Sequence, residues 1–177
     1  MATSLRSETD QLVRLADRDL SRLWRLVASG AAADEALHDL LPAIVTEYGA
    51  AGGALAAEWY DQQREKVDAR GRFLATPLAP DDRGAHALIG SALTTATDDA
   101  SLRTLILGGT QRRIADHVRL TVANNAVADS AAQGWVRVGA GGSCPWCAQY
   151  LDGEVRTVAG YDFDAHDNCN CSVVPAF

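Results

Sequence analysis

The sequence predicts a mainly α protein, α+β overall, with a helical body over residues 1–133 followed by a small β-rich module over residues 134–177. Two observations support this prediction. Through most of the chain, apolar residues recur three and four positions apart, which is the spacing of an amphipathic helix. After Gly134 the pattern changes to short alternating runs between turn residues, and all four cysteines lie in this last part.

Length and composition indicate one ordinary folded domain, or a domain with a small appendix. The chain has 177 residues, and 47% of them are hydrophobic, which is enough to bury a core. It has no run of eighteen apolar residues, and its amino terminus lacks the apolar stretch of a signal peptide. We therefore expect a protein of a reducing compartment that does not enter a membrane.

The net charge of the chain disfavours a protein whose main role is to bind nucleic-acid phosphate. Affinity for phosphate comes largely from clustered Lys and Arg, whereas the formal net charge here is −7. Neither part is basic, since residues 1–133 have 14 basic and 18 acidic side chains and residues 134–177 have 2 and 5.

The first helix is predicted over residues 7–29, with Gly30 placed to end it. Its apolar residues are spaced three and four apart, at Val13, Ala16, Leu20, Leu23 and Val27. A second helical stretch runs from Asp34 to Lys66 and carries Pro42 in its early turns. The Gly52–Gly53 pair weakens the case for one uninterrupted helix there, because glycine destabilises a helix interior.

A loop is predicted after this second helix. Residues 67–83 contain two prolines, a glycine and paired aspartates, and we expect them to separate two helical layers. Just ahead of the loop, the charged residues Asp61, Arg64 and Glu65 are interpreted as a solvated helix end.

Helical patterns resume as a short helix over residues 84–98 and a long helix over residues 100–133. One side of the long helix is lined at helical spacing by Leu107, Ile114, Val118, Thr121 and Asn125. Because Thr121 and Asn125 of this stripe are polar, two interpretations stay open: a face in contact with water, or a face shared with another surface. In the module, alternating runs at residues 135–140, 154–158 and 171–177 predict short strands.

The cysteines and one histidine of the module are spaced like metal ligands. Cys144 and Cys147 form Cys-x2-Cys, and after eighteen residues His166, Cys169 and Cys171 form His-x2-Cys-x-Cys. Two pairs of soft donors at this separation let two turns bring four ligands to one tetrahedral zinc ion. Because thiols stay reduced in the expected compartment, a structural zinc ion is favoured over disulfides and over unlinked thiols.

Five donors compete for four places on the metal. The favoured set is Cys144, Cys147 and His166 with one of the two later cysteines, Cys169 slightly ahead of Cys171. In an extended segment, however, Cys169 and Cys171 point to the same side, and they would complete an all-cysteine site instead. The fifth group would then lie beside the ligands. Trp146, between the paired cysteines, is either a cap over the site or an exposed contact.

No catalytic motif accompanies these donors, and we expect a protein that is not an enzyme. Zinc deaminases need His-x-Glu ahead of Pro-Cys-x-x-Cys, whereas here the histidine follows the cysteine pair and Pro145 lies inside it. The serine-hydrolase, phosphate-loop and zinc-protease motifs are missing from the sequence as well. The other histidines, His38, His86 and His117, are single residues in helical segments and receive no role.

The order "GWVRVGAGGSCPWCAQYLDGEVRTV…AHDNCNCSVVP" resembles the carboxy-terminal region of the phage Mu F-like (MuF) minor head proteins, including those of actinobacterial phages. The likeness covers residues 134–175. Many members of that family have His-Pro-x-Cys-x-Cys with a basic residue between the cysteines, where this chain has Asp167 and Asn170. The departure leaves metal ligation intact and makes the surface beside the site acidic.

The resemblance implies a minor capsid protein of a tailed phage or prophage that acts in head morphogenesis. It would be assembled in the host cytoplasm and reside in the virion, inside the capsid near the portal. Its implied partners are the portal and major capsid proteins, with packaged DNA as a further candidate and no membrane. Helical faces at residues 107–118 and 50–57 are the expected docking surfaces. The alternative is a zinc-stabilised nucleic-acid-binding or DNA-delivery accessory protein.

Overall fold

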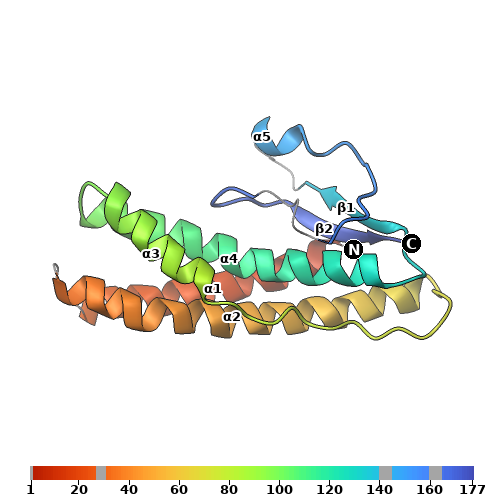
Figure 1. Cartoon of the computed structure of the whole chain (residues 1–177), viewed down its shortest axis with the longest axis horizontal. Coiled ribbons are helices and arrows are strands. Elements are labelled where there is room, and N and C mark those ends of the chain that lie inside the picture. The colour runs from red at the N-terminus through yellow and green to blue at the C-terminus, as the bar shows by residue number, and fades with distance from the viewer. Residues whose placement is uncertain (1, 27–30, 140–144, 160–164) are drawn as a thin grey trace.

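The computed structural model of the chain describes residues 2–26, 31–139, 145–159 and 165–177. It confirms the predicted mainly α fold with a small carboxy-terminal β module. Figure 1 shows the long helices α1, α2 and α4 running side by side, with the sheet and α5 over one part of α4. In chain order the elements are α1 (Ala2–Leu26), α2 (Ala31–Lys66), α3 (Arg83–Thr95), α4 (Asp99–Ala128), β1 (Gly134–Val138), α5 (Pro145–Ala148) and β2 (Ser172–Ala176).

Helix α1 begins earlier than predicted. Leu5 explains the earlier start, because its side chain is buried in the same apolar cluster as Val173 of the module. Further along, Ala16 and Leu20 of the predicted stripe are buried, as the helical spacing requires. The predicted end at Gly30 lies outside the described residues.

Helix α2 passes through the Gly52–Gly53 pair without a break. The two glycines allow close packing: a Cβ atom on Gly52 would lie 2.9 Å from Cγ2 of Val118, and one on Gly53 would lie 3.4 Å from Oγ1 of Thr121. The contact with α4 therefore outweighs the conformational cost of glycine in a helix. The sequence pattern could not show this, because Val118 and Thr121 belong to a helix far along the chain.

The helical faces expected to dock partners pack within the protein instead. On the face at residues 50–57, Ala56 is fully buried, and on the face at residues 107–118, Ile114 and Val118 are buried. The apolar side chains of these faces form the contact between α2 and α4. They are therefore not free to bind a portal or capsid subunit.

Helix α2 also has the length and composition of a membrane span over Asp34–Lys66, although the core helix of a soluble protein passes the same test. In the structure α2 packs against α1, α3 and α4 and buries Leu41, Val45 and Tyr60. This packing is that of a core helix. The expectation that the chain does not enter a membrane stays a prediction.

The end of α2 is only in part the solvated face that its charges suggested, because Glu65 is exposed whereas Arg64 is not. Arg64 is buried, and its Nε donates to Oδ2 of Asp129 at 2.5 Å. The hydroxyl of Tyr60 donates to the same carboxylate at 3.1 Å. Burial, together with the negative charge of Asp129, raises the pKa of Tyr60 far above its ordinary value. The charge of Arg64 is therefore matched inside the protein rather than by water.

The predicted loop at residues 67–83 is confirmed as irregular up to residue 82, where α3 follows, and it is bound along α4. Asn125 accepts the N–H of Thr76 at 2.8 Å and donates to the carbonyl of Thr76 at 2.9 Å. Thr121 Oγ1 accepts the N–H of Leu78 at 3.1 Å. The polar members of the α4 stripe thus satisfy the backbone of the chain's own connection.

The start of α4 has a local cause, and its end coincides with a long-range contact. At its start, Asp98 accepts the N–H of Ser101 at 2.7 Å while the hydroxyl of Ser101 accepts the N–H of Asp98 at 3.0 Å, which forms a capping box. The helix ends before residue 133, because the N–H of Gln133 already donates to the carbonyl of Ala176 in β2 at 2.7 Å. The module therefore begins within the segment that the periodicity predicted as helix.

The module contains a two-stranded antiparallel sheet, in which Trp135 of β1 lies opposite Pro175 of β2. The predicted strand at residues 154–158 is reduced to one isolated bridge, between Trp135 and Arg156. Gly134 makes this bridge possible. Its φ is +137°, and a Cβ atom there would collide with the carbonyl oxygen of Arg156.

One apolar cluster joins the helical body to the module. Its members come from α1, α2, α4, both strands and the cysteine loops, and they include Tyr60, Val122, Trp135, Cys169 and Val173. A second cluster fills the other end of the helices. The division at residue 134 stays a prediction, and the shared cluster shows that the two parts are packed on each other.

Candidate metal centre

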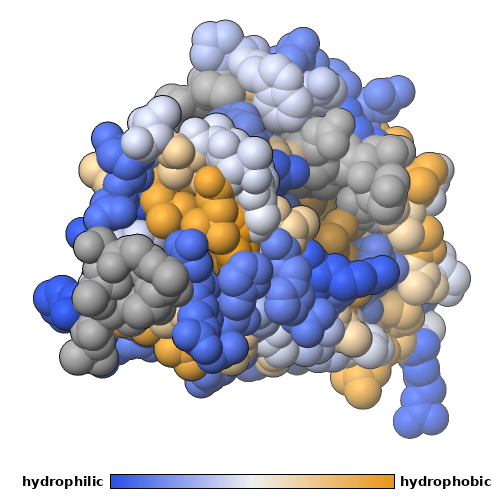
Figure 2. Space-filling view, turned by 60° about the vertical axis from the view of Figure 1, so that its left-hand side comes forward, coloured by the Kyte–Doolittle hydropathy of each residue, from blue (hydrophilic) through white to orange (hydrophobic). Residues whose placement is uncertain are grey.

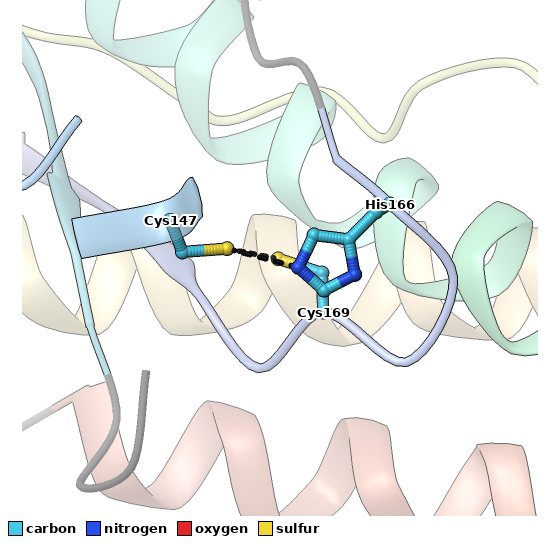
Figure 3. A group of neighbouring side chains, drawn as sticks. All are labelled: Cys147, His166 and Cys169. Carbon is cyan, nitrogen blue, oxygen red and sulfur yellow. Dashed lines mark hydrogen bonds between the residues drawn. The ribbon is translucent and has the colours of Figure 1, made fainter. Parts of the chain in front are cut away.

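Three of the predicted donors gather at one point in the structure. Cys147 comes from α5, while His166 and Cys169 come from the segment that leads into β2 (Figure 3). Cys147 Sγ lies 3.2 Å from His166 Nε2 and 3.5 Å from Cys169 Sγ. The three ligand atoms all lie within 4.8 Å of one another. Together, with Cys171 beside them, they form a group that can bind a metal ion.

The distances fit a tetrahedral zinc ion. With Zn–S bonds of about 2.3 Å and Zn–N bonds of about 2.0 Å, the sulfurs would be about 3.8 Å apart and sulfur and nitrogen about 3.5 Å apart. The observed separations of 3.5 Å and 3.2 Å are only a few tenths of an ångström shorter. The two sulfurs are also far beyond the disulfide bond length of about 2.05 Å, so Cys147 and Cys169 are not bonded to each other.

The ring of His166 is held in the tautomer that a metal ligand needs. Its Nδ1 lies 2.6 Å from the carbonyl oxygen of Asp167, to which it donates. The lone pair of Nε2 then faces the sulfur of Cys147. The edge of Trp146 contacts this ring, with centroids 5.6 Å apart. Because Trp146 also remains 39% exposed, it is both a cap over the site and a surface residue.

Helix α4 fixes the backbone of the second pair of donors. The buried guanidinium of Arg119 donates from Nη2 to the carbonyl of Cys169 at 2.6 Å and from Nε to that of Cys171 at 3.0 Å. The N–H of Asn168 donates to Gln111 Oε1 at 2.8 Å. The segment from His166 to Cys171 is therefore docked on α4 by hydrogen bonds in addition to apolar contact.

A second arginine faces the sulfurs themselves. Arg137 of β1 is 4% exposed, and its Nη2 lies 3.7 Å from Cys147 Sγ and 3.9 Å from Cys169 Sγ. Burial alone lowers the pKa of Arg137, but the hydrogen bond that Arg137 donates to the side chain of Cys171 and the charges of the three cysteines outweigh it, so the pKa is raised. The sulfurs thus favour the charged form of the guanidinium.

The environment of Cys169 favours its thiolate. Burial raises the pKa of the thiol, whereas the backbone N–H of Cys171, the charge of Arg119 and hydrogen bonds from the neighbouring thiols lower it. The lowering contributions prevail, and the pKa lies below its ordinary value. Since the thiolate is the form that ligates metals, the structure prepares this side chain for a metal ion.

The remaining predicted donors have different places. Cys144 lies outside the described residues. Cys171 is buried next to the group but is not one of the three residues whose ligand atoms gather. The geometry thus pairs Cys169 with Cys147 and His166, in line with the favoured set. The full choice among Cys144, Cys147, His166, Cys169 and Cys171 stays a prediction.

Neither Arg119 nor Arg137 was among the residues predicted from the sequence. Arg137 stands two residues after Trp135, so the alternation of a strand puts it on the same buried face. Arg119 stands four residues after Ala115 and three before Val122, on the buried face of α4. In each case the available signal was a charged residue on an apolar face. The role of that residue depended on partners that come later in the sequence.

Comparison with known proteins gives one match. The model of the family described as VG15 protein matches residues 1–177, which is the whole chain. Searches of curated proteins and of solved structures found no significant match.

Proposed function

This chain belongs to the VG15 protein family, a family of phage gene products, and on that premise we propose that it is a minor head protein of a tailed phage. It is of the MuF-like kind, acts as a structural protein rather than an enzyme, and contains a structural zinc ion. The family match supports a phage-associated protein. The likeness of residues 134–175 to MuF proteins supports the more specific role in the head.

The observation that carries the structural role of the metal is the position of the donors. Cys147 and Cys169 are each 2% exposed and belong to the apolar cluster that joins the module to the helices. A zinc ion held by Cys147, His166, Cys169 and one further cysteine would tie α5 to the segment that docks on α4. Its binding free energy would then add to the folding free energy of the module.

Portal and major capsid proteins are the proposed partners, and the docking surface lies elsewhere than on the packed faces of α2 and α4. Figure 2 shows apolar areas interrupted by hydrophilic side chains on the visible face. The large exposed apolar residues of the described chain are spread over several elements, among them Leu40, Leu74 and Val158. Their distribution does not single out one contact surface, so the contact surface has to be mapped by experiment.

Mass spectrometry of purified virions tests the location. We expect the protein in mature particles at a few copies each, and in the fraction that contains the portal when particles are disassembled. Its absence from particles, or its recovery with host proteins alone, would contradict a head protein. Binding to DNA that weakens steeply with salt would instead support the nucleic-acid-binding alternative.

Elemental analysis of protein purified without added zinc tests the metal site. About one zinc ion per chain is expected for the wild type. Cys147→Ser and His166→Ala should each lose most of the metal, because each removes a donor from the described group. A wild-type protein that contains no zinc and takes none up would overturn the site.

A further inference from the structure

Arg137 is a buried cation that faces the sulfurs. The proposed zinc site does not yet give it a role. Resting on that zinc site, we propose that Arg137 is the counter-charge of the metal–thiolate group, a positioning residue that makes binding of the metal by several buried thiolates favourable. It does not ligate the metal. It sets how much negative charge the module can bury around the ion.

The geometry places one guanidinium against three cysteines. Nη2 of Arg137 is 3.7 Å from Cys147 Sγ and 3.9 Å from Cys169 Sγ, and a further hydrogen bond reaches the side chain of Cys171. All four side chains are less than 5% exposed. Water therefore contributes little screening, and hydrogen bonds to charged sulfur are stronger in such surroundings.

The charges explain why the site needs a cation. A zinc ion with a neutral His166 and three thiolates has a net charge of −1, and a fourth thiolate would make it −2. A buried net charge is expensive unless it is paired and hydrogen-bonded. The guanidinium of Arg137 brings the sum for three thiolates to zero. The metal centre and the arginine are therefore each the partner that the other requires.

Two aromatic rings hold the guanidinium in place. Its Cζ lies 5.7 Å from the ring centroid of Trp146 and 5.2 Å from that of Tyr150. On the strand, Arg137 is fixed by pairing with Val173 in the ladder. A planar, delocalised cation suits a place between rings and sulfurs, whereas a lysine would supply the charge without the fork of donors. This arrangement also gives Trp146 a function beyond covering His166.

Arg119 has a different role from Arg137. It donates to the backbone carbonyls of Cys169 and Cys171 and pairs with Asp116 at 2.7 Å. Its charge also favours the Cys169 thiolate, but it is paired with a carboxylate, whereas the guanidinium of Arg137 faces the sulfurs. Arg119 positions the loop, and Arg137 balances the metal group.

Zinc affinity of three full-length variants tests the proposal, measured by competition with a chromophoric chelator. Arg137→Met keeps an apolar stem and removes the charge, and we expect affinity to fall about 10- to 100-fold. Arg137→Lys keeps the charge and should recover part of that loss. The matched control is Arg156→Met. In the wild type the guanidinium of Arg156 also stacks on a ring, that of Trp135 at 5.6 Å, but it pairs with the carboxylate of Asp152. Arg156→Met should stay within about twofold of the wild type.

A cobalt-loaded form supplies a second readout. The sulfur-to-cobalt absorption bands of Arg137→Lys should match those of the wild type, since the ligands are unchanged. This readout does not depend on whether Arg137→Met folds well. Wild-type affinity in Arg137→Met would overturn the proposal. So would equal weakening in the Met and Lys variants, which would assign the effect to packing. A wild type without zinc would overturn the metal site itself, so the two failures are distinguishable.

Discussion

Three buried arginines of this protein have partners that are distant in the sequence. Arg64 is paired with Asp129, Arg119 with the backbone of the cysteine loop, and Arg137 with the sulfurs. A buried ion pair adds little net stability compared with apolar packing, but removal of one partner leaves an unpaired charge and is costly. Single substitutions at such partners should therefore have large effects.

Asp129→Asn is expected to lower the free energy of unfolding by about 3 kcal/mol, because it leaves the charge of Arg64 buried without a counter-ion. Urea denaturation at a fixed zinc concentration measures this change. The control is Asp152→Asn, which removes an exposed pair with Arg156 and should cost much less. Equal losses in the two variants would show that the buried Arg64–Asp129 pair contributes no more to the free energy of unfolding than the exposed pair.

Tyr48 gives a prediction about pH. Its hydroxyl donates to Asp19 at 2.6 Å, and this bond, with burial and the charge of Asp19, raises the pKa of Tyr48 to about 12. The unfolded pKa is near 10, so the stabilisation is complete below about pH 10 and is lost as the pH rises toward 12. Tyr48→Phe should be less stable than the wild type at neutral pH, and in urea unfolding the gap should close over that range. A gap that stays constant would contradict the assignment.

At the scale of elements, glycines determine how closely the helices approach. Gly52 of α2 faces Val118 of α4, and Gly109 of α4 faces Leu88 of α3. Both pairs lie in contacts that hold long helices together, so the small residue serves the packing. Gly90 of α3 is a contrast, because nothing lies within 4 Å of a Cβ atom placed there.

The pair Gly109→Ala and Gly90→Ala tests this role. The methyl group of Gly109→Ala would collide with the side chain of Leu88, and we expect a loss of about 1–3 kcal/mol. Gly90→Ala adds a methyl group in open space and should stabilise the protein by about 0.5–1 kcal/mol through helix propensity. Thermal unfolding measures both. Stabilisation by both substitutions would mean that α3 can shift at no cost.

The elements were predictable where local spacing decides the structure. The helices follow from apolar residues three and four positions apart, and the sheet follows from alternation. The prediction was less accurate where a distant contact decides. Leu5 extends α1 because it reaches the module, and Gly52–Gly53 stays helical because α4 packs there. The solvated end expected at Arg64 was wrong because Asp129 lies after the next two helices.

At the scale of the whole molecule, the shared apolar cluster makes the module and the helices interdependent. Cys169 and Val173 lie in the same cluster as Tyr60 and Val122. The donor spacing allowed the metal group to be predicted from sequence, because Cys-x2-Cys and His-x2-Cys are local patterns. Its attachment through Arg119 and Arg137 could not be predicted, since it depends on how α4 and β1 meet the cysteine loop.

Removal of the metal with a chelator should therefore loosen one end of the protein first. Hydrogen exchange is expected to rise at amides of residues 165–173 and at the neighbouring turn of α4 around Arg119. Amides around Leu41 and Ile89, in the second cluster, should keep their protection. Uniform loss of protection along all helices would contradict this, and would mean that the metal supports the entire fold.

The deep position of the donors also has a kinetic consequence. Cys147 and Cys169 are each 2% exposed, and Arg137 lies against both sulfurs. A chelator in solution can reach the half-buried His166, but it cannot replace the two buried sulfurs while the module stays closed. Release of the ion must wait until the module opens, so its rate should be independent of chelator concentration once the chelator is in excess. The lifetime of the bound ion then reports how often the module separates from α4.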